Sequence, residues 1–174
     1  MEFRKATLDD LEAIALIYDR IHTLEESGET TTGWRRTIYP TQETARAAIL
    51  AGEMFVAEED GTILASAKLN QTQDPAYAKA AWSQDAPAGQ VMVLHTLTVD
   101  PLRAKSGVGT QFVAYYEGYA LHHGCPYLRI DTNERNQAAR RLYQKLGYRE
   151  ADIVPCVFNG LEGVNLVCLE KTLE

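Results

Sequence analysis

The feature that most constrains the fold is a strand, a turn, a helix and a second strand that follow one another along residues 90–132. Residues 90–100, QVMVLHTLTVD, are rich in β-branched residues and predict a strand. Residues 110–124, TQFVAYYEGYALHHG, predict a helix, and residues 126–132, PYLRIDT, predict the next strand. Because a helical crossover joins strands that run parallel, a sheet with a parallel strand pair is expected.

The other segments predict two β-hairpins and three further helices. The hairpins turn at Asp60-Gly61 and Asn159-Gly160, where turn-forming residues separate apolar runs. The helices are expected to begin at Thr7, Thr41 and Asn136, and the remaining strands are expected over residues 1–6, 53–59, 62–70, 148–158 and 163–173. Hairpins combined with a crossover predict a mixed sheet with helices on its faces.

Composition limits the class of protein. The 174 residues are 45% hydrophobic and carry a net charge of −7, which fits one globular domain over residues 1–174 and argues against a general nucleic-acid binder. Cys125, Cys156 and Cys168 lack metal-ligand spacing and suit a reducing compartment. No apolar run reaches 18 residues. We therefore expect a cytoplasmic protein with no metal, nucleic-acid or membrane partner.

The turn between the first strand and the helix, PLRAKSGVG, is basic and contains glycine. Gly107 and Gly109 allow a ligand to approach the backbone, and Arg103 and Lys105 add positive charge. Unpaired N–H groups at a helix N-terminus bind phosphate well. The turn therefore predicts a pyrophosphate site, although a tight structural connection would explain the same residues. A P-loop is excluded, since GxxxxGK[ST] is absent.

A second motif follows the strand over residues 126–132. NERNQAARRLYQKLGY contains the pattern N-x-x-A-x-x-L-Y-x-x-x-G-(F/Y), from Asn136 through Tyr143 to Gly147. Together with LTVDPLRAKSGVG, this segment resembles the GNAT family of N-acetyltransferases over roughly residues 91–148. In that family the glycine turn, (Gln/Arg)-x-x-Gly-x-(Gly/Ala), binds the diphosphate of acetyl-CoA. This chain departs from the pattern at Ala104, where the family has Gln or Arg.

The resemblance implies a fold and a set of cofactor contacts. The expected fold is a GNAT-like α/β (α+β) fold, with a mixed, mostly antiparallel sheet of about seven strands, helices on both faces, and splayed fourth and fifth strands. Acetyl-CoA is expected to lie with its pantetheine arm in the splay and its diphosphate on the glycine turn, and a backbone amide is expected to polarise the thioester. The expected cofactor-binding residues are Leu97, Thr98, Val99, Lys105, Ser106, Gly107, Val108, Gly109, Thr110 and Asn136.

Tyr143 matches the family's general acid, which protonates the departing CoA thiolate; the alternative is an aromatic side chain that packs beneath the sheet. A base must also remove a proton from the acceptor ammonium. Asp131 is one candidate, as a strand residue that otherwise ends the strand or pairs with an arginine. Glu25, with its neighbour Glu26 in a predicted acceptor-side loop, is another. His95 is a third, expected on the same side of its strand as Leu97.

The resemblance implies direct transfer of acetyl from acetyl-CoA to a primary amine in a ternary complex, and no cysteine is positioned as an acyl carrier. Trp34, Tyr39, Tyr77 and Trp82 lie in irregular segments and either line an acceptor pocket or anchor loops. We expect a small amine as acceptor; the alternatives are a protein N-terminus or lysine, or a CoA-binding sensor without activity. The apolar strand over residues 163–173 is expected to pair across a homodimer.

Overall fold

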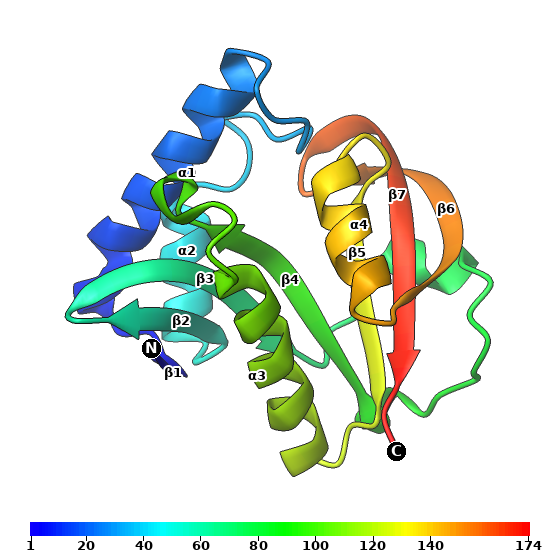
Figure 1. The fold of residues 1–174 in the computed structure, drawn as a ribbon. Helices are drawn as coiled ribbons and strands as arrows, with labels where there is room; N and C mark the ends of the chain where they lie inside the picture. Colours follow the sequence, from blue (N-terminus) through cyan, green and yellow to red (C-terminus); the bar gives the residue numbers. More distant parts are fainter.

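The computed structural model describes residues 1–174 and contains one seven-stranded sheet and four α-helices (Figure 1). The strand order is β1-β2-β3-β4-β5-β7-β6, and every neighbouring pair is antiparallel except β4 and β5. The strands are β1 (Glu2–Lys5), β2 (Met54–Glu59), β3 (Thr62–Asn70), β4 (Val91–Val99), β5 (Tyr127–Asn133), β6 (Arg149–Phe158) and β7 (Leu161–Thr172). The expected mixed, mostly antiparallel α/β sheet is confirmed.

The helices cover both faces of the sheet. They are α1 (Leu11–Glu26), α2 (Gln42–Leu50), α3 (Val108–His122) and α4 (Gln137–Lys145), with 3-10 turns η1 (Leu8–Asp10), η2 (Pro75–Lys79), η3 (Ala88–Gln90) and η4 (Pro101–Arg103). One core lies between the sheet and α3 and α4, and a second lies under α1 and α2. A third core joins η2 to β4, β6 and β7. The helices α3 and α4 therefore cover one face of the sheet (Figure 1).

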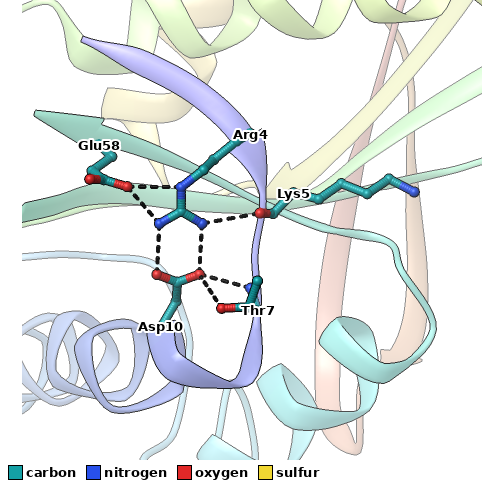
Figure 2. Close-up of polar contacts among 5 residues, drawn as sticks. All are labelled: Arg4, Lys5, Thr7, Asp10 and Glu58. Atoms are coloured by element: carbon teal, nitrogen blue, oxygen red, sulfur yellow. Dashed lines mark hydrogen bonds and ion pairs between the residues drawn. The ribbon is translucent and has the colours of Figure 1, made fainter. Parts of the chain in front are cut away.

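The N-terminal strand is tied to its neighbours by one arginine. Figure 2 shows the Arg4 guanidinium between two carboxylates, at 2.6 and 2.8 Å from Glu58 Oε2 and at 2.8 Å from both oxygens of Asp10. The Thr7 amide also donates to Asp10, at 2.8 Å. These bonds join β1 to β2 and to the start of the first helical segment. The Arg4–Asp10 pair is bidentate, with two guanidinium nitrogens donating to the two carboxylate oxygens, which is the strong form of an arginine–carboxylate pair.

The expected splay of β4 and β5 is confirmed. The parallel pairing runs from Val91↔Tyr127 to Leu94↔Ile130 and ends there. Both strands continue beyond that point, β4 to Val99 and β5 to Asn133. The two ribbons diverge accordingly in Figure 1. The facing edges of β4 and β5 are therefore free of each other over their last residues.

A β-bulge interrupts β4 at the place where the splay begins. The register with β3 passes from Lys68↔His95 to Ser66↔Thr98, so β4 has one residue more than β3 in this interval. Thr96, within the bulge, has φ of +54°. Bulges of this kind bend a strand and increase its twist. The bulge therefore turns the end of β4 away from β5.

The bulge also corrects one expectation from the sequence. Leu97 and Val99 pack with the core under α3 and α4, on the side of Leu94, whereas His95 lines a cavity with Lys68. One additional residue reverses the alternation of side chains along a strand. The expectation that His95 lies on the same side as Leu97 is therefore wrong.

The structure differs from the sequence-based expectation in two further places, the end of the first helix and the pairing of the last strand. The first helix begins at Leu11 after a 3-10 turn and continues to Glu26, so Glu25 and Glu26 lie in its last turn rather than in a loop. The last strand, β7, pairs with β5 on one edge and with β6 on the other. The expectation that this strand pairs across a dimer is wrong, because both of its edges are occupied within the chain.

None of the helices is long and apolar enough to cross a membrane.

Candidate functional site

The turn after β4 presents free backbone amides. Asp100 caps η4 by accepting from the Leu102 amide at 3.0 Å, and α3 then begins after Gly107, whose φ is +85°. The amides of residues 107–110 have no acceptor within the protein, and no side chain caps the helix. A Cβ at Gly107 would meet only Gln111, at 3.8 Å. These amides fit a diphosphate, as the sequence pattern indicates.

The turn after β4 is held in position by contacts with α1 and β3. Arg20 of α1 donates to Asp100 Oδ2 at 2.5 Å, and the Asp100 carboxylate is largely buried. The Asp100 amide donates in turn to the Leu64 carbonyl of β3 at 2.8 Å. The turn is therefore fixed between α1 and the sheet before any ligand binds.

The free edge of β4 supplies a second set of backbone groups. In an antiparallel pair, residues alternate between those that bond the partner strand and those that point away from it. The Asp100 amide bonds β3, and Val99 pairs with Ala65 in the position that points away. The Val99 backbone, and by the same alternation that of Leu97, faces the splay. The Thr98 side chain is buried on the β3 side, where its hydroxyl lies 2.8 Å from that of Ser66.

A cavity of about 60 Å³ lies in the splay and is lined from both faces of the sheet. Leu97 and Asp131 line it from β4 and β5, and Asn136 and Tyr143 line it from α4 and its N-cap. Trp34 and Tyr39 close its other side, together with Phe158 of β6. The structure thus brings four of the sequence-predicted site residues to one cavity.

Asp131 lies at the junction of this cavity with a second one, of about 180 Å³. Its Oδ2 accepts a hydrogen bond of 2.6 Å from the Tyr77 hydroxyl, and it has no ion pair. Burial raises the pKa of the Asp131 carboxyl to about 7, although the Tyr77 hydrogen bond opposes the shift and Asp74 adds to it. A carboxyl that titrates near neutrality is suited to accept and release protons.

Tyr143 and Asn136 come from the motif that follows β5. Tyr143 is 5% exposed, and its hydroxyl forms no hydrogen bond within the protein. Burial, with a smaller contribution from Asp131, raises the pKa of the Tyr143 phenol well above its ordinary value. The Asn136 side chain caps α4 by accepting from the Ala139 amide at 3.2 Å. Tyr143 is therefore a protonated, unengaged donor that lines the cavity.

The aromatic wall is attached to the bulge of β4. The Tyr39 hydroxyl is hydrogen-bonded to the Thr96 hydroxyl, and the Tyr39 ring lies edge-on to Trp34 at 6.4 Å. His22 Nε2 lies 2.8 Å from the Pro40 carbonyl oxygen and holds the adjacent backbone. These contacts set the shape of the cavity on the side away from α4.

Two candidates for the base have other roles in the structure. The Glu25 carboxylate accepts from the Thr32 and Gly33 amides at 2.8 and 2.9 Å and from the Thr30 hydroxyl at 2.9 Å, and it does not line the cavity. Glu25 thus organises the loop that carries Trp34. Glu26 pairs with Arg36 at the surface.

His95 is also poorly suited to act as the base. Burial, with a smaller contribution from Lys68, lowers the pKa of the His95 imidazole to about 4. Its Nε2 lies 2.8 Å from the Asn70 side-chain oxygen, and it lines the second cavity. A neutral imidazole with this pKa accepts protons weakly at pH 7. Elsewhere, the structure contains no group of three or more His, Cys, Asp or Glu side chains arranged to hold a metal ion.

The sequence pattern did not indicate the partner of Asp131 or the position of the bulge. Tyr77 was one of four aromatic residues in irregular segments, and it lies 54 residues from Asp131 in the chain. Thr96 carried no signal, because it is one of several β-branched residues in a segment that predicts a strand. Contacts of this separation depend on how η2 packs on the sheet.

Comparison with known proteins agrees with this geometry. The model of the Acetyltransferase (GNAT) family matches residues 18–148. The uncharacterized N-acetyltransferase YhfO of Bacillus subtilis (strain 168) is 25% identical over 150 residues, covering 86% of this chain and 91% of YhfO. An acetyltransferase of the GNAT family from Streptococcus agalactiae has a TM-score of 0.82 at 23% identity, with 99% and 95% of the chains covered. For yncA from Salmonella typhimurium, solved with its cofactor acetyl-CoA, the TM-score is 0.71 at 20% identity, with 100% and 94% covered.

Proposed function

Because this chain belongs to the GNAT family of acetyltransferases, we propose that it transfers acetyl from acetyl-CoA directly to the primary amine of a small acceptor, in a ternary complex. The observation that carries the proposal is the meeting of Asp131 and Tyr143 at one cavity between the splayed strands. Acetyl-CoA supplies an activated acetyl thioester. The chain must supply a place for it, a base and an acid.

The amides of residues 107–110 hold the diphosphate, and the free backbone edge at Leu97 and Val99 holds the pantetheine arm. Asn136 keeps its side-chain nitrogen available for the same arm, since its oxygen caps α4. An amide on the β4 edge donates to the thioester carbonyl oxygen and stabilises the negative charge that develops there.

Proton transfer is divided between two side chains. Asp131 takes one proton from the acceptor ammonium, so that the nitrogen lone pair can form the new C–N bond as the C–S bond breaks. Tyr143 gives its proton to the departing CoA thiolate, and the second proton that the nitrogen loses on becoming an amide returns, through solvent, to the Tyr143 phenolate. The environments of the two groups support these roles, because the pKa of Asp131 lies near neutrality while that of Tyr143 is raised.

The cavity also supports a small acceptor. Trp34, Tyr39 and Phe158 narrow the space beside Asp131, and two of the three come from segments outside the sheet. Aromatic faces beside a carboxylate attract an ammonium group. A large protein substrate would have to insert its amine into the narrow space between these aromatic side chains and Asp131.

The test is an acetylation assay with acetyl-CoA and a panel of primary amines, followed by the release of the CoA thiol. We expect turnover with at least one small amine, and a fall in kcat of about 10²-fold or more in Asp131→Asn with acetyl-CoA affinity retained. Asp152→Asn is the matched control, because Asp152 accepts from the Ala81 amide away from the cavity. Acetyl-CoA binding without turnover across the panel would contradict the proposal.

A further inference from the structure

The segment between β3 and β4 sends one side chain to the candidate base. Tyr77 lies in η2 and is 2% exposed, and its hydroxyl donates a hydrogen bond of 2.6 Å to Asp131 Oδ2. It is the only hydrogen-bond donor to that carboxylate within the protein. The other carboxylate oxygen, Oδ1, has no partner within the protein.

Tyr77 is itself held rigidly by the rest of its segment. The Trp82 indole N–H donates to the Tyr77 carbonyl at 2.8 Å, and the two rings lie edge-on at 5.2 Å. The Arg129 guanidinium lies over the Trp82 ring at 4.1 Å, so the segment is also attached to β5 two residues before Asp131. Asp74 caps η2 by accepting from the Ala76 amide at 2.8 Å. The phenol therefore meets the carboxylate in a fixed geometry.

The charges around Asp131 make this hydrogen bond important. The titratable groups that influence Asp131 from packed elements are Asp74, Tyr77, Tyr143, Tyr39, Cys168 and Cys156. Across the second cavity lie Lys68, which pairs with Glu53 at 3.7 Å, and the neutral His95. None of these groups forms an ion pair with Asp131, so the Tyr77 hydroxyl is the closest group that favours the ionised carboxylate.

We infer that Tyr77 is a positioning residue for the base: its hydroxyl fixes Asp131 Oδ2, keeps the carboxylate available for proton removal near neutral pH, and leaves Oδ1 to receive the acceptor ammonium. This inference rests on the role of Asp131 in the proposed function. It also gives the segment between β3 and β4 a function, which is to set the pH range of the reaction.

The direction in which the pKa of Asp131 changes on loss of the Tyr77 hydroxyl follows from electrostatics. A hydrogen bond donated to a carboxylate favours its charged form and lowers its pKa. Removing the hydroxyl in Tyr77→Phe should raise the pKa of Asp131 by about one unit, given the strength of hydrogen bonds to charged groups. The acid limb of the kcat/KM profile should move to higher pH by the same amount, and activity below the limb should fall about tenfold.

Two measurements on the whole 174-residue chain test this. The first is the pH dependence of kcat/KM, and the second is the titration of the Asp131 carboxyl by ¹³C NMR, which does not require turnover. Tyr116→Phe is the matched control, because Tyr116 is also fully buried and its hydroxyl donates to a carbonyl, that of Met92, at 2.6 Å. It should lose a similar hydrogen bond without any shift of the Asp131 titration.

The outcomes separate the inference from the proposed function. A shift of both the NMR titration and the acid limb in Tyr77→Phe supports both. An unchanged NMR titration overturns the positioning role, even if Asp131→Asn is inactive. A shifted NMR titration with an unmoved acid limb also overturns it, and removes Asp131 as the base. If Tyr77→Phe does not fold, 3-fluorotyrosine at position 77 is a stronger donor and should move both readings to lower pH; no movement would overturn the inference.

Discussion

At the scale of single residues, the proposed base, Asp131, and the proposed acid, Tyr143, line the same cavity. The pKa of Asp131 lies near neutrality because its carboxyl is withdrawn from solvent in a partly buried position with no cation paired to it, and Tyr143 stays protonated because burial and Asp131 both disfavour the phenolate. The surroundings raise the pKa of both groups above their ordinary values. The carboxylate therefore accepts a proton more readily than an exposed aspartate would, and the phenol keeps its proton until the leaving thiolate takes it.

Tyr143→Phe should lower kcat by about 10²-fold while leaving the acetyl-CoA affinity unchanged, because only the proton to the leaving thiolate is lost. Steady-state kinetics with calorimetric acetyl-CoA titrations measure both quantities. Tyr148→Phe is the control, since Tyr148 is also buried but its hydroxyl donates to Glu117 at 3.1 Å, outside the cavity. Equal kcat values for the wild type and Tyr143→Phe would rule out the acid role.

At the scale of elements, the end of β4 carries most of the cofactor contacts that we propose. The bulge at Thr96 separates the strand from β5, and the next residues offer their backbone to the splay. The same strand then leads into η4 and Gly107, where α3 begins with unpaired amides. Arg20 and Asp100 fasten this connection to α1. One continuous segment therefore presents both an edge for the pantetheine arm and an end for the diphosphate.

Gly107→Glu should abolish acetyl-CoA binding in calorimetry, because the side chain would occupy the amide site and repel the diphosphate. Gly124→Glu is the matched control. Gly124 lies just beyond the other end of α3, its φ of +71° imposes a similar backbone cost, and its Cβ would meet no other atom within 4 Å. It should bind acetyl-CoA as the wild type does. Binding by a folded Gly107→Glu variant would refute the assignment of the diphosphate site.

At the scale of the whole molecule, the two faces of the sheet contribute different parts of the site. α3 and α4 bring the amides, Asn136 and Tyr143 from one face, whereas the loop after α1 and the η2 segment bring Tyr39 and Tyr77 from the other. The splay is the place where both faces can reach the same cavity.

Asp10→Asn should lower the free energy of unfolding at pH 7 by about 1–3 kcal/mol, because it breaks the bidentate pair with Arg4 (Figure 2). The hydrogen bond from Arg4 lowers the pKa of Asp10 in the folded protein. The stabilisation is thus fully present above the unfolded pKa of about 3.9 and is lost as pH falls through the folded value.

Urea unfolding at pH 7 and in acid measures this difference, which should shrink below about pH 4. Asp9→Asn is the control, since the Asp9 side chain is exposed and takes part in no ion pair. A difference between wild type and Asp10→Asn that is the same at both pH values would contradict the assignment of the stabilisation to this ion pair.

Much of this protein was determined by local sequence. The crossover over residues 90–132, the hairpin turns at Asp60-Gly61 and Asn159-Gly160, and the Thr41 cap all act within a few residues, so they were readable from the chain alone. The motif from Asn136 to Tyr143 is similarly local, because a helix fixes the spacing of its own residues. These elements determined the mixed sheet and the expectation of an acetyl-CoA site.

The tertiary structure decided what depends on packing between distant segments. The bulge at Thr96 moved His95 to the other face, which no periodicity could reveal, because the extra residue is defined only against β3. The Glu25 carboxylate stabilises the loop after α1, because it accepts hydrogen bonds from backbone amides that lie beyond the end of that helix. Asp131 acquired its pKa near 7 and its partner Tyr77 only through burial and a contact 54 residues away, since desolvation is a property of the folded interior rather than of the chain.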